Sequence, residues 1–397
     1  MANRIFNTLL ISVFTSMIGL GVIYPLIPTL AKNMGATGLY LGLVISAFSI
    51  SRLILMPIIG RLSDKHSKKK FILTGLFLYS ACSLLYLLAE NVFGLVLARL
   101  LQGVSSAMVV PVAMAYIAQL TKHGKEGKTM GTFSMALFLG WATGPLLGGF
   151  VNQKFGFNAV FYCMAIFALI AFSLCLFLLP DIKIGLDKEN KIPLASFRKI
   201  IFHSKVLPLI IFRIFSALGR GGIMAFIPLY AAKINIPTDK IGIIISLNVY
   251  FMAIFQRPFG KLADRFNRFH LVLIGMIVMA ASLFLIPSCK NFIELVMVNC
   301  LLGLGGAISM SSSTAMAANA GRSLGMGSTM GIFSTAMSIG MTIAPLIAGI
   351  IFDLMGINFL FTFFGASLIL GTIIIYIIYN LMDDGSETED SKNSVVT

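Results

Sequence analysis

An internal repeat constrains this chain more than any other feature of its sequence. Residues 131–149 read GTFSMALFLGWATGPLLGG, and residues 331–349 read GIFSTAMSIGMTIAPLIAG. The second stretch repeats glycines and a proline of the first at an offset of 200 residues (331 − 131), in the pairs Gly131 and Gly331, Gly140 and Gly340, Pro145 and Pro345, and Gly149 and Gly349. Shared residues at one long offset indicate duplication. The chain is therefore predicted to contain two homologous halves.

The same offset relates other parts of the chain. Residues 60–65 read GRLSDK, and residues 260–265 read GKLADR. Two further pairs at this offset are Pro28 with Pro228 and Gly103 with Gly303. An aspartate, several glycines and two prolines at one spacing exceed what chance would give, so the duplication extends over the whole chain.

Both halves are rich in apolar segments long enough to cross a membrane. Hydrophobic residues make up 58% of the chain and charged residues 11%, whereas soluble proteins have about 25% charged residues. A helix needs about 20 apolar residues to span a bilayer. Windows near that length are residues 5–31, 39–60, 71–89, 92–119, 127–150, 157–179, 206–231, 239–260, 271–288, 292–319, 325–352 and 357–381. We predict an all-α integral membrane protein with twelve transmembrane helices in two pseudo-symmetric six-helix bundles.

These windows define the expected domains. Residues 1–180 form the first bundle, 181–205 a basic central loop, 206–382 the second bundle, and 383–397 an acidic tail. The tail is predicted to be disordered because its residues are mostly acidic and polar. The start of the chain has no small-residue cleavage site, so we expect a first span and not a removed signal peptide.

Basic residues concentrate in the loops at one end of the predicted spans. Arg61, Lys69 and Lys70 follow the second span, and Lys188 and Lys191 lie in the central loop. Loops rich in lysine and arginine face the cytoplasm. Both termini are therefore expected in the cytoplasm, with the chain in the plasma (inner) membrane. The net charge of +15 follows from this topology and does not predict nucleic-acid binding.

The glycine-rich stretch at residues 131–149 is unusual for a helix. Glycines along one side of a helix let a neighbouring backbone come very close, and an internal proline removes a hydrogen bond and kinks the helix. The expected hinge residues are Gly131, Gly140, Gly144, Pro145, Gly148, Gly149 and Pro345. The simpler alternative is a helix-packing seam without a hinge function.

Four motifs resemble one known family. The glycine–proline stretch at 131–149, the loop at 60–70, the first-span segment GLGVIYPLIP at 19–28 and RLLQG at 99–103 are similar to those of the major facilitator superfamily, in its twelve-span drug:proton antiporter branch. Ser67 replaces a glycine that is usual in the loop motif. The resemblance covers essentially the whole chain. It implies a secondary transporter that exports amphipathic drugs or metabolites by alternating access, coupled to protons.

Two aspartates are candidates for a conformational latch. Asp64 and Asp264 lie at the predicted cytoplasmic ends of matched spans, beside cations. A carboxylate there can cap the N-terminus of a neighbouring helix, where free amides favour an anion. The expected latch residues are Gly60, Asp64, Lys65, Lys68, Gly260, Asp264 and Arg265. The alternative is ordinary solvated loop charge.

Arginines at membrane depth are the strongest indication of a binding site. Arg52, Arg99 and Arg220 lie well inside their windows, where each costs about 2.5–3.5 kcal/mol on insertion scales. Arg213 and Arg257 lie nearer the span ends, from which their side chains can extend to the surface. Cations without an equally deep carboxylate favour an acidic or zwitterionic amphiphile. The alternative for Arg220 is packing at a glycine-rich break in its helix.

Proton coupling has few candidate residues. The resemblance implies a coupling role for Arg99, and Asp64 is the second candidate. Alternatively, Gln102 and backbone carbonyls satisfy Arg99. Polar groups that are expected to join Arg52 and Arg220 in binding substrate are Tyr24, Tyr116, Asn248 and Asn299.

The sequence contains no nucleotide-binding loop, nucleophile–base pair or metal-ligand cluster, so we expect neither an enzyme nor a cofactor. The expected partners are a small amphipathic substrate, protons and membrane lipids, with the chain acting as a monomer. One rival is a facilitator or flippase of anionic amphiphiles or lipids with little proton coupling. A remoter one is a membrane sensor or scaffold that does not transport.

Overall fold

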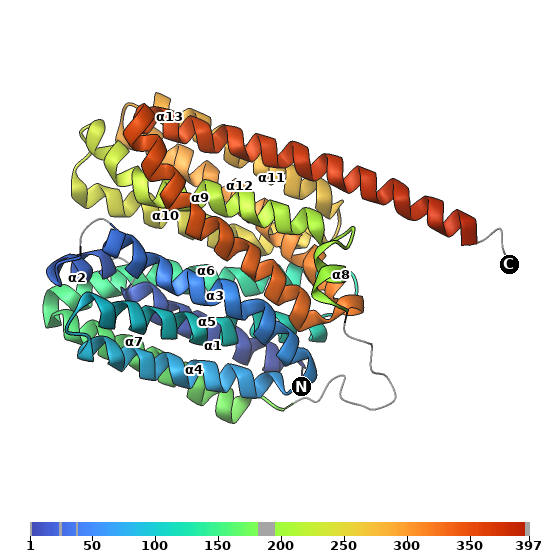
Figure 1. Ribbon diagram of the computed structural model, residues 1–397, viewed down its shortest axis with the longest axis horizontal. Coiled ribbons are helices and arrows are strands. Elements are labelled where there is room, and N and C mark those ends of the chain that lie inside the picture. Colours follow the sequence, from blue (N-terminus) through green and yellow to red (C-terminus); the bar gives the residue numbers. More distant parts are fainter. Residues whose placement is uncertain (1, 24–25, 37–38, 182–194, 394–397) are drawn as a thin grey trace.

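The computed structural model describes residues 2–23, 26–36, 39–181 and 195–393, and these residues are mainly helical. The first half of the chain forms a group of long, roughly parallel or antiparallel helices, coloured blue to green in Figure 1. Its elements are α1 (Ala2–Ile23), α2 (Ile27–Asn33), α3 (Leu39–Lys65), α4 (Lys68–Leu85), the 3₁₀ turn η1 (Tyr86–Leu88), α5 (Val92–Leu120), α6 (Glu126–Phe155) and α7 (Phe157–Leu178).

The second half forms a similar group, coloured yellow to red. A short helix, α8 (Phe197–Ile201), precedes it. The remaining elements are α9 (Leu207–Lys233), α10 (Thr238–Ala263), α11 (Arg268–Leu285), the 3₁₀ turn η2 (Ile286–Ser288), α12 (Phe292–Leu324) and α13 (Met326–Asn393).

The repeat extends to the residues that start and end helices. The side chain of Asn91 caps α5 by accepting a hydrogen bond from the Gly94 amide, and Asn291 caps α12 in the same way. Gly156 and Gly356 have φ angles of 82° and 78°, a region that favours glycine. Gly156 separates α6 from α7, and Gly356 interrupts the helical geometry of α13.

This interruption explains the number of spans. The described chain has 10 helices long and apolar enough to cross a membrane, or 11 if the two parts of α9, bent by 40°, are one span. The last of these spans, Met326–Met382, contains the break at Gly356. Counting its two parts separately gives twelve spans (11 + 1), as the sequence predicts.

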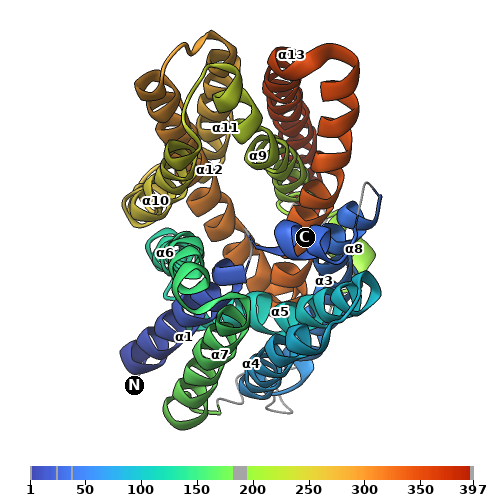
Figure 2. The same ribbon diagram turned by 90° about the vertical axis from the view of Figure 1, so that its left-hand side faces the viewer.

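Each half has its own apolar core. Most residues of the largest buried cluster lie between residues 5 and 179, and a second cluster runs from residue 212 to residue 375. The halves meet where α6 packs against α10 and α3 packs against α13, which Figure 2 shows in an end-on view. The molecule thus has two cores, one in each half, and the interface between the halves consists of matched helix pairs.

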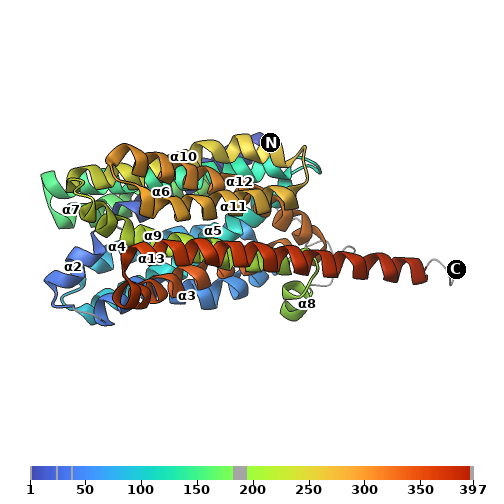
Figure 3. The same cartoon turned by 90° about the horizontal axis from the view of Figure 1, so that it is seen from above.

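Three segments differ from the sequence expectation. The first window, 5–31, contains two helices, α1 and α2, and Pro28 lies in the first turn of α2, where its missing N–H costs nothing. The predicted central loop contains α8, although its residues 182–194 lie outside the described part. The predicted disordered tail is helical through Asn393, because adding residues to an existing helix avoids the cost of nucleation. Figure 3 shows this extension of α13 beyond the other helices.

Candidate functional site

Asp64, at the end of α3, caps the first turn of α13 in the other half. Its carboxylate accepts hydrogen bonds from the Gly327 amide at 2.6 Å, the Ser328 amide at 2.8 Å and the Ser328 hydroxyl at 2.8 Å. The Asp64 side chain is 4% exposed. A buried carboxylate on free helix amides stabilises this contact by up to about 2 kcal/mol. We call this contact the Asp64 latch.

Asp264 makes the equivalent contact in the opposite direction. Its carboxylate accepts hydrogen bonds from the amides of Gly127 at 2.6 Å and Lys128 at 2.8 Å, in the first turn of α6. We call this the Asp264 latch. Both latches lie at one end of the molecule. The evidence is a hydrogen bond from Arg322, which lies just before α13, to the carbonyl of Thr121, which lies just before α6. We call this end the latch end.

Glycines let the two halves approach closely at the latch end. A Cβ atom on Gly60 would overlap the carbonyl of Gly327, and one on Gly260 would overlap the carbonyl of Gly127. In both pairs the obstacle is backbone, which a rotamer change cannot move away. The latch end is therefore closed in this structure, and each latch needs a glycine on both sides.

The other predicted latch residues behave differently from one another. Lys68 is buried, donates from Nζ to the Ser63 carbonyl at 2.9 Å, and lies 3.9 Å from the Asp64 carboxylate. Lys65 and Arg265 are exposed. Arg268, at the position 200 residues after Lys68, lies 3.3 Å from Asp264. The repeat was the signal that could have identified Arg268.

Glu126, a residue that sequence reasoning missed, connects the halves at the Asp264 latch. Its side chain is 2% exposed, and its two oxygens lie 2.9 Å from the Arg268 guanidinium and 3.1 Å from the Arg322 guanidinium. Both arginines belong to the second half. An acidic residue in the first turn of α6 also interacts favourably with the helix dipole. A cluster of one acid and two cations therefore crosses the interface.

The glycine-rich stretch of α6 contacts two different neighbours. A Cβ atom on Gly131 would meet the carbonyl of Gln256 in α10, across the interface. Cβ atoms on Gly140, Gly144 and Gly148 would meet the backbone of α1, within the same half. Gly149, in contrast, has open space around its Cα. The stretch is a close-packed seam, and its role as a hinge stays a prediction.

The two hinge prolines occupy equivalent places. Pro145 lies inside α6 and Pro345 inside α13, and both helices continue past the proline without a break in helical assignment. Pro345 is exposed and Pro145 is half-buried. Neighbouring helices in a membrane protein can accommodate the lost backbone hydrogen bond.

Arg99 is satisfied by neutral groups within the first half. Its Nη1 donates to Gln102 Oε1 at 2.8 Å and its Nε to the Val44 carbonyl at 3.3 Å. Gln102 in turn bonds to the hydroxyls of Tyr86 at 2.7 Å and Tyr79 at 3.1 Å. This network stabilises the buried cation without a carboxylate, as the alternative reading predicted, and coupling through Arg99 stays a prediction.

Three other arginines have much poorer partners. Arg52 and Arg220 are half-buried, and Arg213 is 6% exposed. Arg220 Nη1 contacts the Met252 sulfur at 2.7 Å, and Arg213 contacts the Met310 sulfur and the Phe333 ring. The Nε groups of Arg52 and Arg213 are buried without a hydrogen-bond partner among the described residues.

The prediction that Arg213 extends to the surface is wrong. Arg213 and Arg220 are seven residues apart on α9, and this spacing places both on one face of a helix, toward the protein interior. The spacing was visible in the sequence. Arg257 is exposed.

The described polar residues among the predicted binding residues bond to other parts of the protein. Asn248 and Asn299 contact each other, because Asn248 Nδ2 donates to the Asn299 carbonyl at 2.6 Å between α10 and α12. Tyr116 is buried near the end of α5 and donates to the Pro180 carbonyl at 2.8 Å. Tyr24 lies outside the described residues. Gln256 was missed, and its buried amide has no partner among the described residues.

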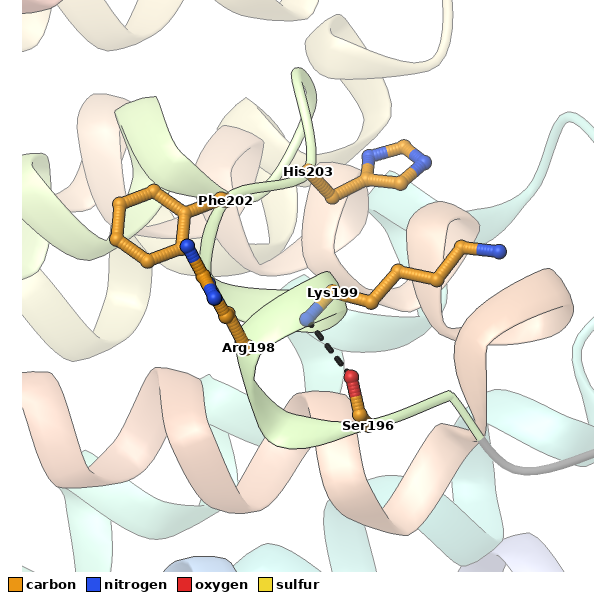
Figure 4. A pocket seen from close by; sticks show the side chains of 5 residues that line it. All are labelled: Ser196, Arg198, Lys199, Phe202 and His203. Atoms are coloured by element: carbon orange, nitrogen blue, oxygen red, sulfur yellow. Dashed lines mark hydrogen bonds between the residues drawn. The ribbon is translucent and has the colours of Figure 1, made fainter.

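A separate hollow of about 510 Å³ lies beside α8. Figure 4 shows its lining of Ser196, Arg198, Lys199, Phe202 and His203. Burial lowers the pKa of His203, and the charges of Lys205 and Lys199 lower it further, which favours the neutral imidazole. This hollow is on the segment that joins the halves. In the part of the chain that the structure describes, no group of three His, Cys, Asp or Glu residues could hold a metal ion.

Comparison with known proteins connects this arrangement to one family. A sequence model of the Major Facilitator Superfamily matches residues 9–232 and 209–395. An uncharacterised MFS-type transporter of Methanocaldococcus jannaschii is 30% identical over 92% of this chain and 96% of its own length. Multidrug resistance protein 2 of Bacillus subtilis is 31% identical, with 92% and 93% covered. The quinolone resistance protein NorA of Staphylococcus aureus is 29% identical, with 88% and 90% covered.

A solved structure has the same fold. The human organic anion transporter MFSD10 superimposes with a TM-score of 0.80 and covers 94% of this chain and 99% of its own. The sequences are 15% identical. At that identity the likeness supports the arrangement of helices and nothing about the substrate.

Proposed function

Since this chain belongs to the Major Facilitator Superfamily, whose members are multi-pass membrane transporters, we propose that it exports small amphipathic compounds by alternating access, coupled to the proton gradient. The family membership makes it a secondary transporter. The direction of transport, the class of substrate and the coupling are the proposal.

One observation carries the alternating-access part. The same contact, a carboxylate on the first turn of a helix in the other half, occurs once in each direction at the latch end. These contacts cross between the halves and contain few atoms, so a rocking motion can break them together. The matched α6–α10 and α3–α13 pairs supply the surfaces about which the halves rock.

The relatives support the substrate class. Two of them are named for resistance to many drugs or to quinolones, and both match nearly the full length of this chain. The methionine and phenylalanine side chains around Arg213 form a polarisable surface that can repack around different compounds. A broad range of amphipathic substrates fits such a lining.

Coupling is proposed to act through the Asp64 latch. Protonating Asp64 would replace an acceptor with a donor and weaken its hold on the Gly327 and Ser328 amides. A proton and the closed state therefore compete for the same carboxylate. Two ligands that prefer different states of one equilibrium are coupled.

The latch end is proposed to face the cytoplasm, with the chain in the plasma membrane. The basic loop after α3 and the basic segment around α8 lie at this end. Lysine- and arginine-rich segments stay on the cytoplasmic side. Both termini then lie in the cytoplasm.

A susceptibility panel in a strain stripped of other efflux pumps tests the function. The wild-type chain is expected to raise resistance to several amphipathic compounds, and Asp64→Asn is expected to abolish most of the gain. The matched control is Asp353→Asn, the same change at an exposed residue of α13. Equal resistance with and without the wild-type chain, at verified expression, would contradict export.

The poorly partnered arginines favour a second candidate, a facilitator or flippase of anionic amphiphiles with little proton coupling. Proteoliposomes with an internal pH dye separate the two. An antiporter changes the internal pH while it moves substrate, and Asp64→Asn reduces that change. Substrate movement without a pH change would favour the facilitator.

A further inference from the structure

We propose that Arg52, Arg213 and Arg220 together bind the acidic group of an amphipathic organic anion. This inference rests on the proposed transport function and names the class of substrate. It concerns the charge that the site selects.

The three arginines come from both halves of the molecule. Arg52 lies on α3 in the first half, and Arg213 and Arg220 lie one above the other on α9 in the second half. Arg213 contacts Met310 and Arg220 contacts Met252, and these two methionines belong to one packed cluster. Arg213 also lies over the ring of Phe333 in α13, the helix that packs against α3, which carries Arg52. Three cations in the interior, contributed by both bundles, therefore create one electropositive region at the interface that moves during alternating access.

No carboxylate balances this charge in the described part of the chain. The buried acid Glu126 belongs to the latch end and already has two arginine partners. A guanidinium has five N–H donors, and the contacts of Arg213 are a thioether sulfur and an aromatic ring. Sulfur is a weak acceptor. The unpartnered Nε groups of Arg52 and Arg213 are donors suited to a carboxylate, sulfonate or phosphate.

Arg99 is a buried arginine of the same chain that has oxygen acceptors for its guanidinium. It shares the Phe48 ring with Arg52, at 4.8 Å and 5.2 Å from the ring centroid. Arg99 nevertheless donates hydrogen bonds to the Gln102 amide oxygen and to the Val44 carbonyl, which offset the cost of burying its charge.

Arg52 and Arg213 have an unpartnered Nε and no hydrogen bond to an oxygen acceptor among the described residues. The Nε of Arg322 is also unpartnered, but its Nη2 bonds to Glu126 and to the Thr121 carbonyl. The contrast favours a ligand role for Arg52 and Arg213 over a packing role.

The fold leaves space for the third arginine. A Cβ atom at Gly306 of α12 would overlap Nη2 of Arg220. Arg220 also follows Gly219 and precedes the bend of α9 after Gly221. The guanidinium is thereby held against α12, and Arg220 is half-buried.

The surroundings fit the apolar part of an amphiphile. Met252, Met310 and Phe333 contact the guanidinium groups directly. Thioether and aromatic surfaces can adapt to varied ring systems. A cationic compound would find the same apolar surface but would have to approach three positive charges. The site therefore selects anions over cations of the same size and shape.

Two dyes with the same ring system test this selectivity. The full chain in phosphatidylcholine nanodiscs is titrated into anionic fluorescein and cationic rhodamine 6G, and binding is followed by fluorescence polarisation. We expect fluorescein to bind about tenfold or more tightly than rhodamine 6G, a preference that salt reduces. Repeating the titration in nanodiscs with phosphatidylglycerol tells whether an anionic lipid competes for the site.

Variants assign the preference to the arginines. Arg213→Gln is expected to weaken fluorescein binding about tenfold or more and to leave rhodamine 6G binding unchanged or improved. Arg213→Lys keeps the charge and should retain part of the affinity. Gly306→Ala displaces the Arg220 guanidinium and should weaken fluorescein binding with all three arginines present. The control Arg257→Gln removes an exposed arginine and should change nothing.

Equal affinities, tighter binding of the cation, or no anion binding below about 1 mM would overturn the inference. An equal effect of Arg213→Gln on both dyes would also overturn it, because it would indicate lost packing. The two proposals fail differently. If the chain gives resistance to cationic drugs but shows no preference for anions, the export proposal stands and the anion site is contradicted. If the chain binds anions but shows no counterflow in proteoliposomes, the transport proposal is contradicted and the anion site stands.

Discussion

The Asp64 and Asp264 latches close the same end of the molecule with the same backbone contact but with different charges around it. Each aspartate accepts hydrogen bonds from two successive amides at a helix start, at 2.6 and 2.8 Å. At the Asp264 latch, Glu126 adds ion pairs across the interface to Arg268 and Arg322. The position equivalent to Glu126 in the other half is Met326, which is apolar and buried.

The comparison separates what the duplication preserved from what it did not. The aspartate and the glycines, which form the backbone contact, occur in both halves. A cation from the same half, Lys68 or Arg268, also lies beside each aspartate, whereas Glu126 and its ion pairs across the interface occur at one latch only. The Asp64 latch thus depends on hydrogen bonds and burial, with Lys68 from its own half. The Asp264 latch also depends on ion pairs between the halves, so salt and charge changes act mainly there.

The largest effect is expected from a side chain placed at the shared backbone contact. Gly327→Val would put a branched side chain against the Gly60 carbonyl, which cannot move without separating α3 from α13. The latch end should then stay open, with transport lost and fast hydrogen exchange at the Gly327 and Ser328 amides. Gly127→Val should do the same at the other latch, since the contact is shared.

The control is Gly242→Val in α10, because a side chain at Gly242 meets open space and no role is assigned to this residue. It should retain transport and slow exchange at both helix starts. If Gly327→Val kept slow exchange and full transport, the close approach of the halves would not be part of the transport cycle.

A smaller and unequal effect is expected from the charges. Glu126→Gln removes the carboxylate that pairs with Arg268 and Arg322, which are partly exposed, so the loss should be about 1–2 kcal/mol. Exchange at Gly127 and Lys128 should become faster and less dependent on salt. Met326→Gln, at the equivalent position, should leave the salt dependence of both latches unchanged. Equal salt dependence of the two latches in the wild type would contradict the comparison.

The sequence predicted the repeated features well. Twelve spans, two bundles and the glycine seam follow from apolar length and from residues matched at one offset, and the Asp64 and Asp264 contacts lie where the repeat places them. Such features depend on local pattern, which one sequence displays. Helix boundaries were predicted less well, as at α2, α8 and the end of α13. They depend on capping and on helix continuation, which the hydrophobic pattern of the sequence does not show clearly.

The features that are not repeated were harder to predict. In the sequence, Glu126 lies in a basic segment, where an acidic side chain is usually exposed to solvent. Its partners could not be predicted, because Arg268 and Arg322 are 142 and 196 residues away. Arg213 resembled a side chain that reaches the surface, since its orientation depends on how α9 packs. Tyr116 is polar inside a span, but a segment of its own half binds it. Long-range packing decides each case.

The smallest effect is expected from the two exposed latch candidates. Lys65 and Arg265 follow the latch aspartates directly, and the repeat places a cation at both positions. Both side chains are exposed, and an exposed charge near a latch is screened by water and salt. Lys65→Gln and Arg265→Gln should therefore leave resistance and hydrogen exchange at both helix starts unchanged, whereas Lys68→Gln should speed exchange at Gly327 and Ser328, because Lys68 is buried beside Asp64. A loss of transport in Lys65→Gln as large as in Asp64→Asn would contradict this expectation. It would mean that Lys65 acts in a state that is open at the latch end. The charges at the two latches would then differ less than they do in the closed state.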